Sequence, residues 1–427
     1  MEPTDPVSLR RPVARAAGPD ARAAPGAVWF PALDGLRAVA ALLVVVFHTS
    51  GSVAYFAEPL QRLPNDAKGI WAGAGVLARL GNWGVAIFFV LSGFLLYRPF
   101  VAAWLGGRPG TSMRNYFTRR LMRIIPAYWV ALTYYLLIVR HNHRPPGGYG
   151  SYLLFYGFAQ NYRTGYVDQG GGLAVAWTLC IEMSFYLVLP LLAWGLRAVS
   201  PARRSMAARV RAQLVVLAAA SIATVGLRYW VISERPLQTF WLQAHFAWFG
   251  LGMMAAVLHA GAGNGVRLPY VVRMLGRFPE LSWLFGLQVF WLSSLIVVRP
   301  WIQTRPELMW IFLANGISAA LLLAPLVFGD QREGWLRAGL SRFPLRWLGE
   351  ISYGVYLWHT IWLVVVVDWV ADGSVPQGFW PRFAVVMLIT FAVAHVSLVA
   401  LERPLMKLVQ RPTRRAQPAP APPGPAG

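Results

Sequence analysis

The sequence predicts an all-α membrane protein, a polytopic bundle of about ten transmembrane helices. Of its 427 residues, 57% are hydrophobic and only 13% are charged, and the mean hydropathy is +0.48. Soluble domains usually carry about 25% charged residues, so this composition argues against a soluble fold. Apolar stretches recur along the whole chain, and each is long enough to cross about 30 Å of hydrocarbon.

Ten of these stretches are expected to be membrane spans within one domain that covers residues 30–408. They lie at residues 36–56, 82–104, 119–139, 173–196, 209–230, 238–260, 281–298, 309–329, 351–371 and 381–402. The apolar segment 152–161 is too short to cross a bilayer and is expected to be interfacial or re-entrant. Residues 1–29, which are basic, and 409–427, which are rich in Pro and Ala, are predicted to be disordered cytoplasmic tails.

The net charge of +22 predicts an orientation in the membrane and not a nucleic-acid partner. With the N-terminus in the cytoplasm, 25 of the 39 Lys and Arg residues lie in cytoplasmic segments and 11 in segments outside. The positive-inside rule then gives an N-in, C-in topology, with lipid headgroups as partners of the basic loops. We expect a multi-pass protein of the plasma (inner) membrane that does not bind nucleic acid.

Residue types that bind metals or form disulfides are sparse. The single cysteine, Cys180, lies within an expected span, which argues against a disulfide framework and a thiolate metal site. His141 and His143 form a pair in a loop, but two ligands without a third are weak evidence for a metal. We therefore expect no metal and no permanently bound cofactor.

Arg37 and His48 are the most informative pair in the chain. They are eleven positions apart in an apolar run, so they share one helix face with a rise of about 16 Å between them. If this helix crosses the membrane, Arg37 lies near one surface and His48 near the midplane, where an ionisable group indicates a functional site. The structural alternatives are that His48 is hydrogen-bonded to another helix and that Arg37 is an anchor paired with Asp34.

More arginines are expected at the same cytoplasmic surface. Arg120 and Arg123 are three positions apart and project from one face of the third span, while Arg98 ends the second span. Together with Arg37, four arginines from three spans can line one cytoplasmic mouth. The alternative is that they are anchors that snorkel to lipid headgroups.

Three further polar residues within expected spans are candidates. Glu182, about nine residues into the fourth span, either joins two helices or takes part in proton chemistry. Ser92, beside Gly93, permits close packing of helices. His359 lies about eight residues into the ninth span.

This combination of residues suits a polyanion at the mouth and a proton-transfer group inside the membrane. Guanidinium groups bind phosphates bidentately and stay charged, and coenzyme A carries a 3′-phosphate and a pyrophosphate. Histidine exchanges protons near neutral pH. The pantetheine arm, on the order of 15–20 Å long, matches the helical rise from the mouth to His48. The geometry predicts acyl transfer from a cytoplasmic thioester.

The chain resembles the membrane-bound acyltransferase-3 family, whose members O-acylate carbohydrates and related hydroxyl compounds. The resemblance runs from about Phe30 to Met406 and is carried by six motifs in order. They are Leu33–Arg37 with His48, Phe88–Phe94, Arg120 with Arg123, Trp177–Tyr186, Ser352–His359 and Glu402–Pro404.

The resemblance implies roles for these positions. His48 is the expected catalytic histidine, with Arg37 and Glu182 assisting. Arg37, Arg120 and Arg123 are the expected acyl-CoA-binding residues, to which the position of Arg98 at the cytoplasmic mouth adds a fourth. Ser92, His359 and Tyr353 are further candidates. The donor is expected to be acyl-CoA, first of all acetyl-CoA, and the acceptor a hydroxyl of a carbohydrate, a glycolipid or a macrolide-type compound. The appended esterase-like domain of some family members is not expected.

Two questions stay open at the level of sequence. His48 is either a general base on the acceptor hydroxyl or a nucleophile that carries the acyl group. Outside the enzyme class, the alternatives are a transporter or flippase for a glycolipid or polysaccharide precursor and a non-catalytic scaffold.

Overall fold

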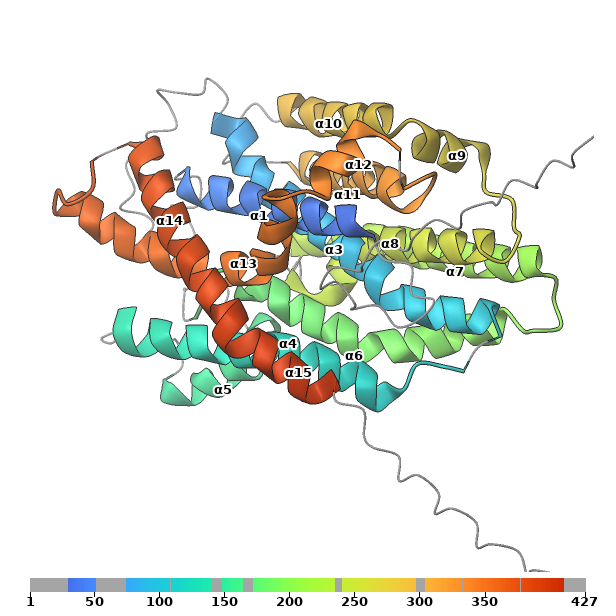
Figure 1. Cartoon of the computed structure of the whole chain (residues 1–427), viewed down its shortest axis with the longest axis horizontal. Helices are drawn as coiled ribbons and strands as arrows, with labels where there is room; N and C mark the ends of the chain where they lie inside the picture. The colour runs from blue at the N-terminus through green and yellow to red at the C-terminus, as the bar shows by residue number, and fades with distance from the viewer. Residues whose placement is uncertain are drawn as a thin grey trace, which may run out of the picture.

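The computed structural model describes residues 30–50, 74–107, 109–139, 148–163, 172–234, 240–296, 304–331, 333–376 and 378–410, and all regular elements within these ranges are helical. Figure 1 shows α1 and α3 between a group formed by α9 to α12 and a group formed by α4 to α6. The two tails predicted to be disordered lie outside the described residues, as do His141 and His143.

Nine helical segments within the described residues are long and apolar enough to cross a membrane, and the chain is a multi-pass membrane protein. They are Pro31–Thr49 (α1), Gly81–Leu105 (within α3, Ala74–Leu105), Met113–Val139 (α4, Met113–Tyr134, with η2, Tyr135–Val139), Ala176–Val199 (α6), Met206–Val231 (within α7, Met206–Glu234), Leu242–Ala262 (α8), Arg305–Val327 (α11), Leu345–Ala371 (α13) and Phe379–Val409 (α14, Phe379–Ser397; η6, Leu398–Glu402; α15, Arg403–Gln410).

The remaining expected span, at residues 281–298, corresponds to helix α10, Pro279–Ile296. This helix borders residues 297–303, which lie outside the described part of the chain. The shorter helix α9 (Tyr270–Arg277) lies between α8 and α10 in the chain, and α12 (Trp335–Leu340) lies between α11 and α13. The N-in, C-in orientation stays a prediction from the distribution of charge.

The first helix is displaced from its predicted range. It begins at Pro31, five residues before the expected start, because proline is well accommodated in the first turn of a helix, where its missing N–H is not needed. It ends at Thr49. His48 therefore lies in the last turn of α1, whereas His359 lies at the centre of the 27-residue helix α13.

The segment expected to be too short for a span folds as three short helical turns. They are η3 (Tyr149–Ser151), α5 (Tyr152–Tyr156) and η4 (Gln160–Tyr162). The Tyr128 hydroxyl of α4 donates to the Phe155 carbonyl, and the Asn161 amide donates to the carbonyls of Trp177 and Phe240. These bonds fix the segment against α4 and against the beginnings of α6 and α8.

Helix α1 packs directly on α13, and the two run in the same direction. Asp34 meets Gly349 at one end of the contact, and His48 meets His359 at the other. Gly349 permits the approach because a Cβ there would overlap the backbone carbonyl of Asp34. Small residues allow helix backbones this close in membrane proteins.

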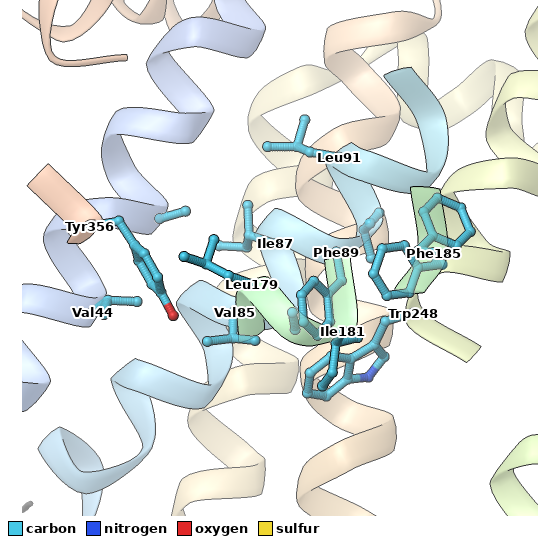
Figure 2. Close-up of a cluster of buried hydrophobic side chains, with 14 of the residues drawn as sticks. Val44, Val85, Ile87, Phe89, Leu91, Leu179, Ile181, Phe185, Trp248 and Tyr356 are labelled. Atoms are coloured by element: carbon cyan, nitrogen blue, oxygen red, sulfur yellow. The ribbon is translucent and has the colours of Figure 1, made fainter. Parts of the chain in front are cut away.

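The central core joins α3 to α6 and α8. Gly93 of α3 lies against the Phe249 backbone of α8, and the rings of Phe89 and Phe185 both stack on Phe249. Figure 2 shows Val85 and Ile87 of α3 and Leu179 of α6 between Tyr356 and the rings of Phe89 and Phe185. This packing holds the spans that carry the predicted site residues in fixed positions.

The contact at Gly349 should be sensitive to a single methyl group. We expect Gly349→Ala to lower the stability of the protein by about 1–3 kcal/mol, because the two helix backbones must separate. The matched control is Gly226→Ala in α7, where a Cβ meets open space and the gain in helix propensity is up to about 1 kcal/mol. Thermal unfolding in detergent measures both; equal melting temperatures for the two variants would contradict the close packing.

Candidate functional site

A cavity of about 90 Å³ lies where α1, α3, α4, α6 and α13 meet. Six of the nine site residues predicted from the sequence line it: Arg37, Ser92, Arg120, Arg123, Glu182 and Tyr353. The other lining side chains are mostly apolar residues of α3 and α6. The cavity is therefore an apolar chamber with polar groups concentrated on a few positions, as is common in ligand sites.

Three of the lining residues are arginines, one from α1 and two from successive turns of α4. Arg37, Arg120 and Arg123 are partly buried, and none forms a hydrogen bond or an ion pair with another described residue. Arg37 lies close enough to Arg123, Asp34 and Glu182 to sense their charges. Guanidinium groups that face a cavity without a bonded carboxylate form a site for an anion with several charged oxygens.

Glu182 joins two helices at the wall of the cavity. Its Oε1 atom accepts hydrogen bonds from the Ser92 hydroxyl, at 3.0 Å, and from the Tyr186 hydroxyl, at 2.7 Å. Ser92 belongs to α3 and Tyr186 to α6, so the carboxylate fixes the relative position of these helices. Glu182 therefore joins α3 to α6 and also lines the cavity.

Tyr353 ties α13 to the arginine-bearing helix. Its hydroxyl donates to the carbonyl of Ile124, at 2.8 Å, one residue beyond Arg123. Ile124 and Tyr353 both line the cavity. Tyr353 thus fixes the wall of the cavity from which Arg120 and Arg123 project.

His48 and His359 form a pair outside the lining of the cavity. Their rings lie 4.9 Å apart, and His359 Nε2 is 3.2 Å from His48 Nδ1. His359 is fully buried, whereas His48 is partly exposed. The structure therefore brings together the two histidines that the sequence placed in different spans.

Tyr356 separates the histidine pair from the cavity. Its ring centroid lies 6.0 Å from that of His359 and 5.8 Å from that of Phe88. Its hydroxyl hydrogen-bonds the Thr178 hydroxyl, at 2.6 Å, and donates to the Val175 carbonyl, at 3.2 Å. Phe88 and Tyr356 both line the cavity, and Tyr356 also contacts His359, so we call these two rings the aromatic partition.

Arg98 does not line the cavity, so three of the four predicted arginines meet there. Its guanidinium lies over the ring of Phe30, 4.8 Å from the centroid. Arg98 follows Leu96, the last α3 residue that lines the cavity, by two positions along the helix, so it lies beyond the end of this wall.

One buried arginine was missed at the level of sequence. Arg382 of α14 is completely buried, and its Nε and Nη2 atoms donate to the Thr49 carbonyl at 3.0 and 2.9 Å. It thereby caps the C-terminal end of α1, next to His48, where a cation is favourable for the helix dipole. The available signal was an arginine at the second position of the expected span 381–402.

Metal ligands do not gather within the described residues. No three His, Cys, Asp or Glu side chains of that part of the chain come together as a metal site would require. Cys180 is buried there as a free thiol.

Comparison with known proteins identifies the domain. A family model described as an acyltransferase domain, that of the acyltransferase-3 family, matches residues 30–398. No solved structure matches the chain.

The curated relatives are distant in sequence but cover most of the chain. YrhL of Bacillus subtilis (strain 168), assigned as a peptidoglycan O-acetyltransferase, is 26% identical over 396 residues, 88% of this chain and 55% of that protein. The peptidoglycan O-acetyltransferase OatA of Listeria monocytogenes is 24% identical over 392 residues, 89% of this chain and 56% of that protein. The chain thus spans little more than half the length of these two relatives. Nodulation protein 10 of Rhizobium leguminosarum bv. viciae is 26% identical over 356 residues, 76% of this chain and 82% of that protein.

The three arginines should bind an anion with several charged oxygens, and inorganic pyrophosphate is a simple probe. We expect Arg123→Gln to weaken pyrophosphate binding about tenfold or more, because a charge-assisted hydrogen bond is worth about 1.5–3 kcal/mol. Arg119→Gln is the matched control, since Arg119 precedes the pair on the same helix but is exposed. Isothermal titration calorimetry in detergent measures the pyrophosphate affinity of both variants. An equal loss of affinity in the two would mean that the cavity is not the anion site.

Proposed function

The chain belongs to the acyltransferase-3 family, and we propose that it is a membrane O-acyltransferase. In this proposal it moves an acyl group, acetyl in the first instance, from cytoplasmic acyl-CoA to a hydroxyl of a carbohydrate or glycolipid. The names of the relatives from Bacillus and Listeria, which refer to O-acetylation of peptidoglycan, support a carbohydrate acceptor. The distribution of charge supports the cytoplasmic position of the donor.

The arginine cluster is the proposed binding site for the phosphates of the donor. Arg37, Arg120 and Arg123 present three guanidinium groups to the cavity, and coenzyme A offers them several anionic oxygens. The apolar walls suit the pantetheine arm, which has few charges. In this proposal the arginine cluster binds the nucleotide, and the apolar walls direct the thioester toward α13.

His48 is the proposed group that acts on the reacting atoms. As a general base, its Nε2 accepts the proton of the acceptor hydroxyl while the hydroxyl oxygen forms a bond to the thioester carbonyl carbon. The carbon–sulfur bond then breaks, and the leaving thiolate takes the proton from His48. Alternatively, His48 Nε2 itself attacks the carbonyl and the carbon–sulfur bond breaks, with the thiolate leaving. In a second step the acyl group passes from Nε2 to the acceptor hydroxyl, whose proton goes to the thiolate; both routes use the same side chain.

The aromatic partition sets a condition on this mechanism. Phe88 and Tyr356 close the described cavity toward the histidines, and His359 follows Tyr356 by one helical turn, about 4.5 Å along the axis. The thioester therefore reaches His48 when these rings move apart. The partly exposed side of His48 is the proposed approach for the acceptor.

The observation that carries the proposal is the placement of three guanidinium groups, which pair with no carboxylate among the described residues, in a cavity that Tyr356 lines three residues before His359. A transporter needs no such reactive group at the end of its cavity, and no described feature favours that alternative.

Replacement of His48 should abolish most of the activity. We expect His48→Ala to lower the rate of acyl transfer by about 10²- to 10⁴-fold, the usual contribution of a general acid–base group, with little change in donor affinity. Transfer of labelled acetyl groups from acetyl-CoA by purified protein in lipid vesicles, with cell-envelope glycans as acceptor, measures it. His245→Ala is the control, because His245 is also buried within a span but lies outside the cavity lining. Activity equal to that of the wild-type protein in a folded His48→Ala variant would overturn the role proposed for His48.

A further inference from the structure

We propose that His359 is a positioning residue that holds His48 in its reactive tautomer. The proposal rests on the proposed function, because it concerns the histidine that acts on the acyl group. The observation behind it is the contact of 3.2 Å between His359 Nε2 and His48 Nδ1, which joins α13 to α1.

The protonation of His359 follows from its own hydrogen bond. Its Nδ1 lies 3.0 Å from the carbonyl oxygen of Val355, one turn earlier on α13. A carbonyl oxygen only accepts, so Nδ1 carries the hydrogen. In the neutral ring Nε2 then has a free lone pair, and this lone pair faces His48.

The tautomer of His48 follows in the same way. Its Nδ1 lies 2.8 Å from the Val44 carbonyl oxygen and 3.2 Å from His359 Nε2. Both neighbours are acceptors, so His48 Nδ1 carries the hydrogen and donates it to this pair. Nε2 of His48 is left with its lone pair, and within the described part of the chain it makes no hydrogen bond. The network therefore leaves one nitrogen free to accept a proton or attack a carbonyl.

The contact also stabilises the state that forms during the reaction. When His48 Nε2 takes a proton or an acyl group, the ring becomes positively charged and its Nδ1–H becomes a stronger donor. His359 then supplies a neutral acceptor in a fully buried position. The same division of labour, in which one group orients a histidine and stabilises its charged form, operates in catalytic triads.

Orientation by a second side chain matters here because His48 lies at a helix end. Helix α1 ends at Thr49, one residue after His48. Arg382 holds the terminal carbonyl of the helix, and His359 holds the imidazole ring. Within the described residues, His359 of α13 is the side chain from another helix that hydrogen-bonds the His48 ring.

The test separates positioning from a merely structural role. We expect His359→Leu to lower kcat by about 10- to 100-fold, as is typical for removal of a group that orients a reactive side chain, with the KM for acetyl-CoA unchanged. His359→Gln should recover most of kcat, because its amide oxygen can accept from His48 Nδ1. The control is His245→Leu: His245 shares the burial and the Nδ1 contact with a carbonyl four residues earlier but does not contact His48, so kcat should be retained.

A second measurement does not depend on turnover. In wild-type protein with ¹⁵N-labelled histidines, solid-state NMR should detect coupling between two nitrogens across one N–H···N bond, and His359→Gln should remove it. If wild-type protein transfers no acyl group, the proposed function fails and the positioning role fails with it. If it is active but a folded His359→Leu variant keeps its kcat, or the coupling is absent, the positioning role alone is overturned.

Discussion

The close contact between α1 and α13 is the constraint on which the rest of the site depends. Asp34 and Gly349 bring the two backbones together, and the parallel course of the helices then places His48 beside His359. Arg37 lies on α1 between these two contacts. Any separation of the two helices would widen the cavity at its arginine end and break the histidine pair at the other.

The site keeps positive charge without full internal compensation. Ionisable side chains within a membrane domain are costly, and two carboxylates, Asp34 and Glu182, act on Arg37 from nearby. Glu182 is bound by two hydroxyl groups instead of an arginine. In the proposed mechanism an incoming polyanion supplies the missing counter-charge, and the cost of holding the arginines apart from carboxylates becomes binding energy for the donor.

The sequence was sufficient for the elements but not for their contacts. Composition and hydropathy predicted the helices, and helical periodicity placed Arg37 and His48 on one face of one helix. Periodicity within one helix cannot say which neighbours a side chain meets, so Arg98 was grouped with the cavity arginines although its guanidinium lies over Phe30 instead. The partition at Tyr356 and the cap by Arg382 depend on contacts between helices far apart in the chain. The site roles themselves remain predictions that need activity measurements.

The central claim is that one donor molecule is bound by the arginines and reaches the histidine pair. Cryo-electron microscopy of the protein with a non-hydrolysable thioether analogue of acetyl-CoA tests it most directly. The account predicts phosphate oxygens about 2.7–2.9 Å from the guanidinium groups of Arg37, Arg120 and Arg123, with the sulfur directed past a displaced Tyr356 toward His48. Phosphates bound elsewhere, with this cavity empty, would contradict it.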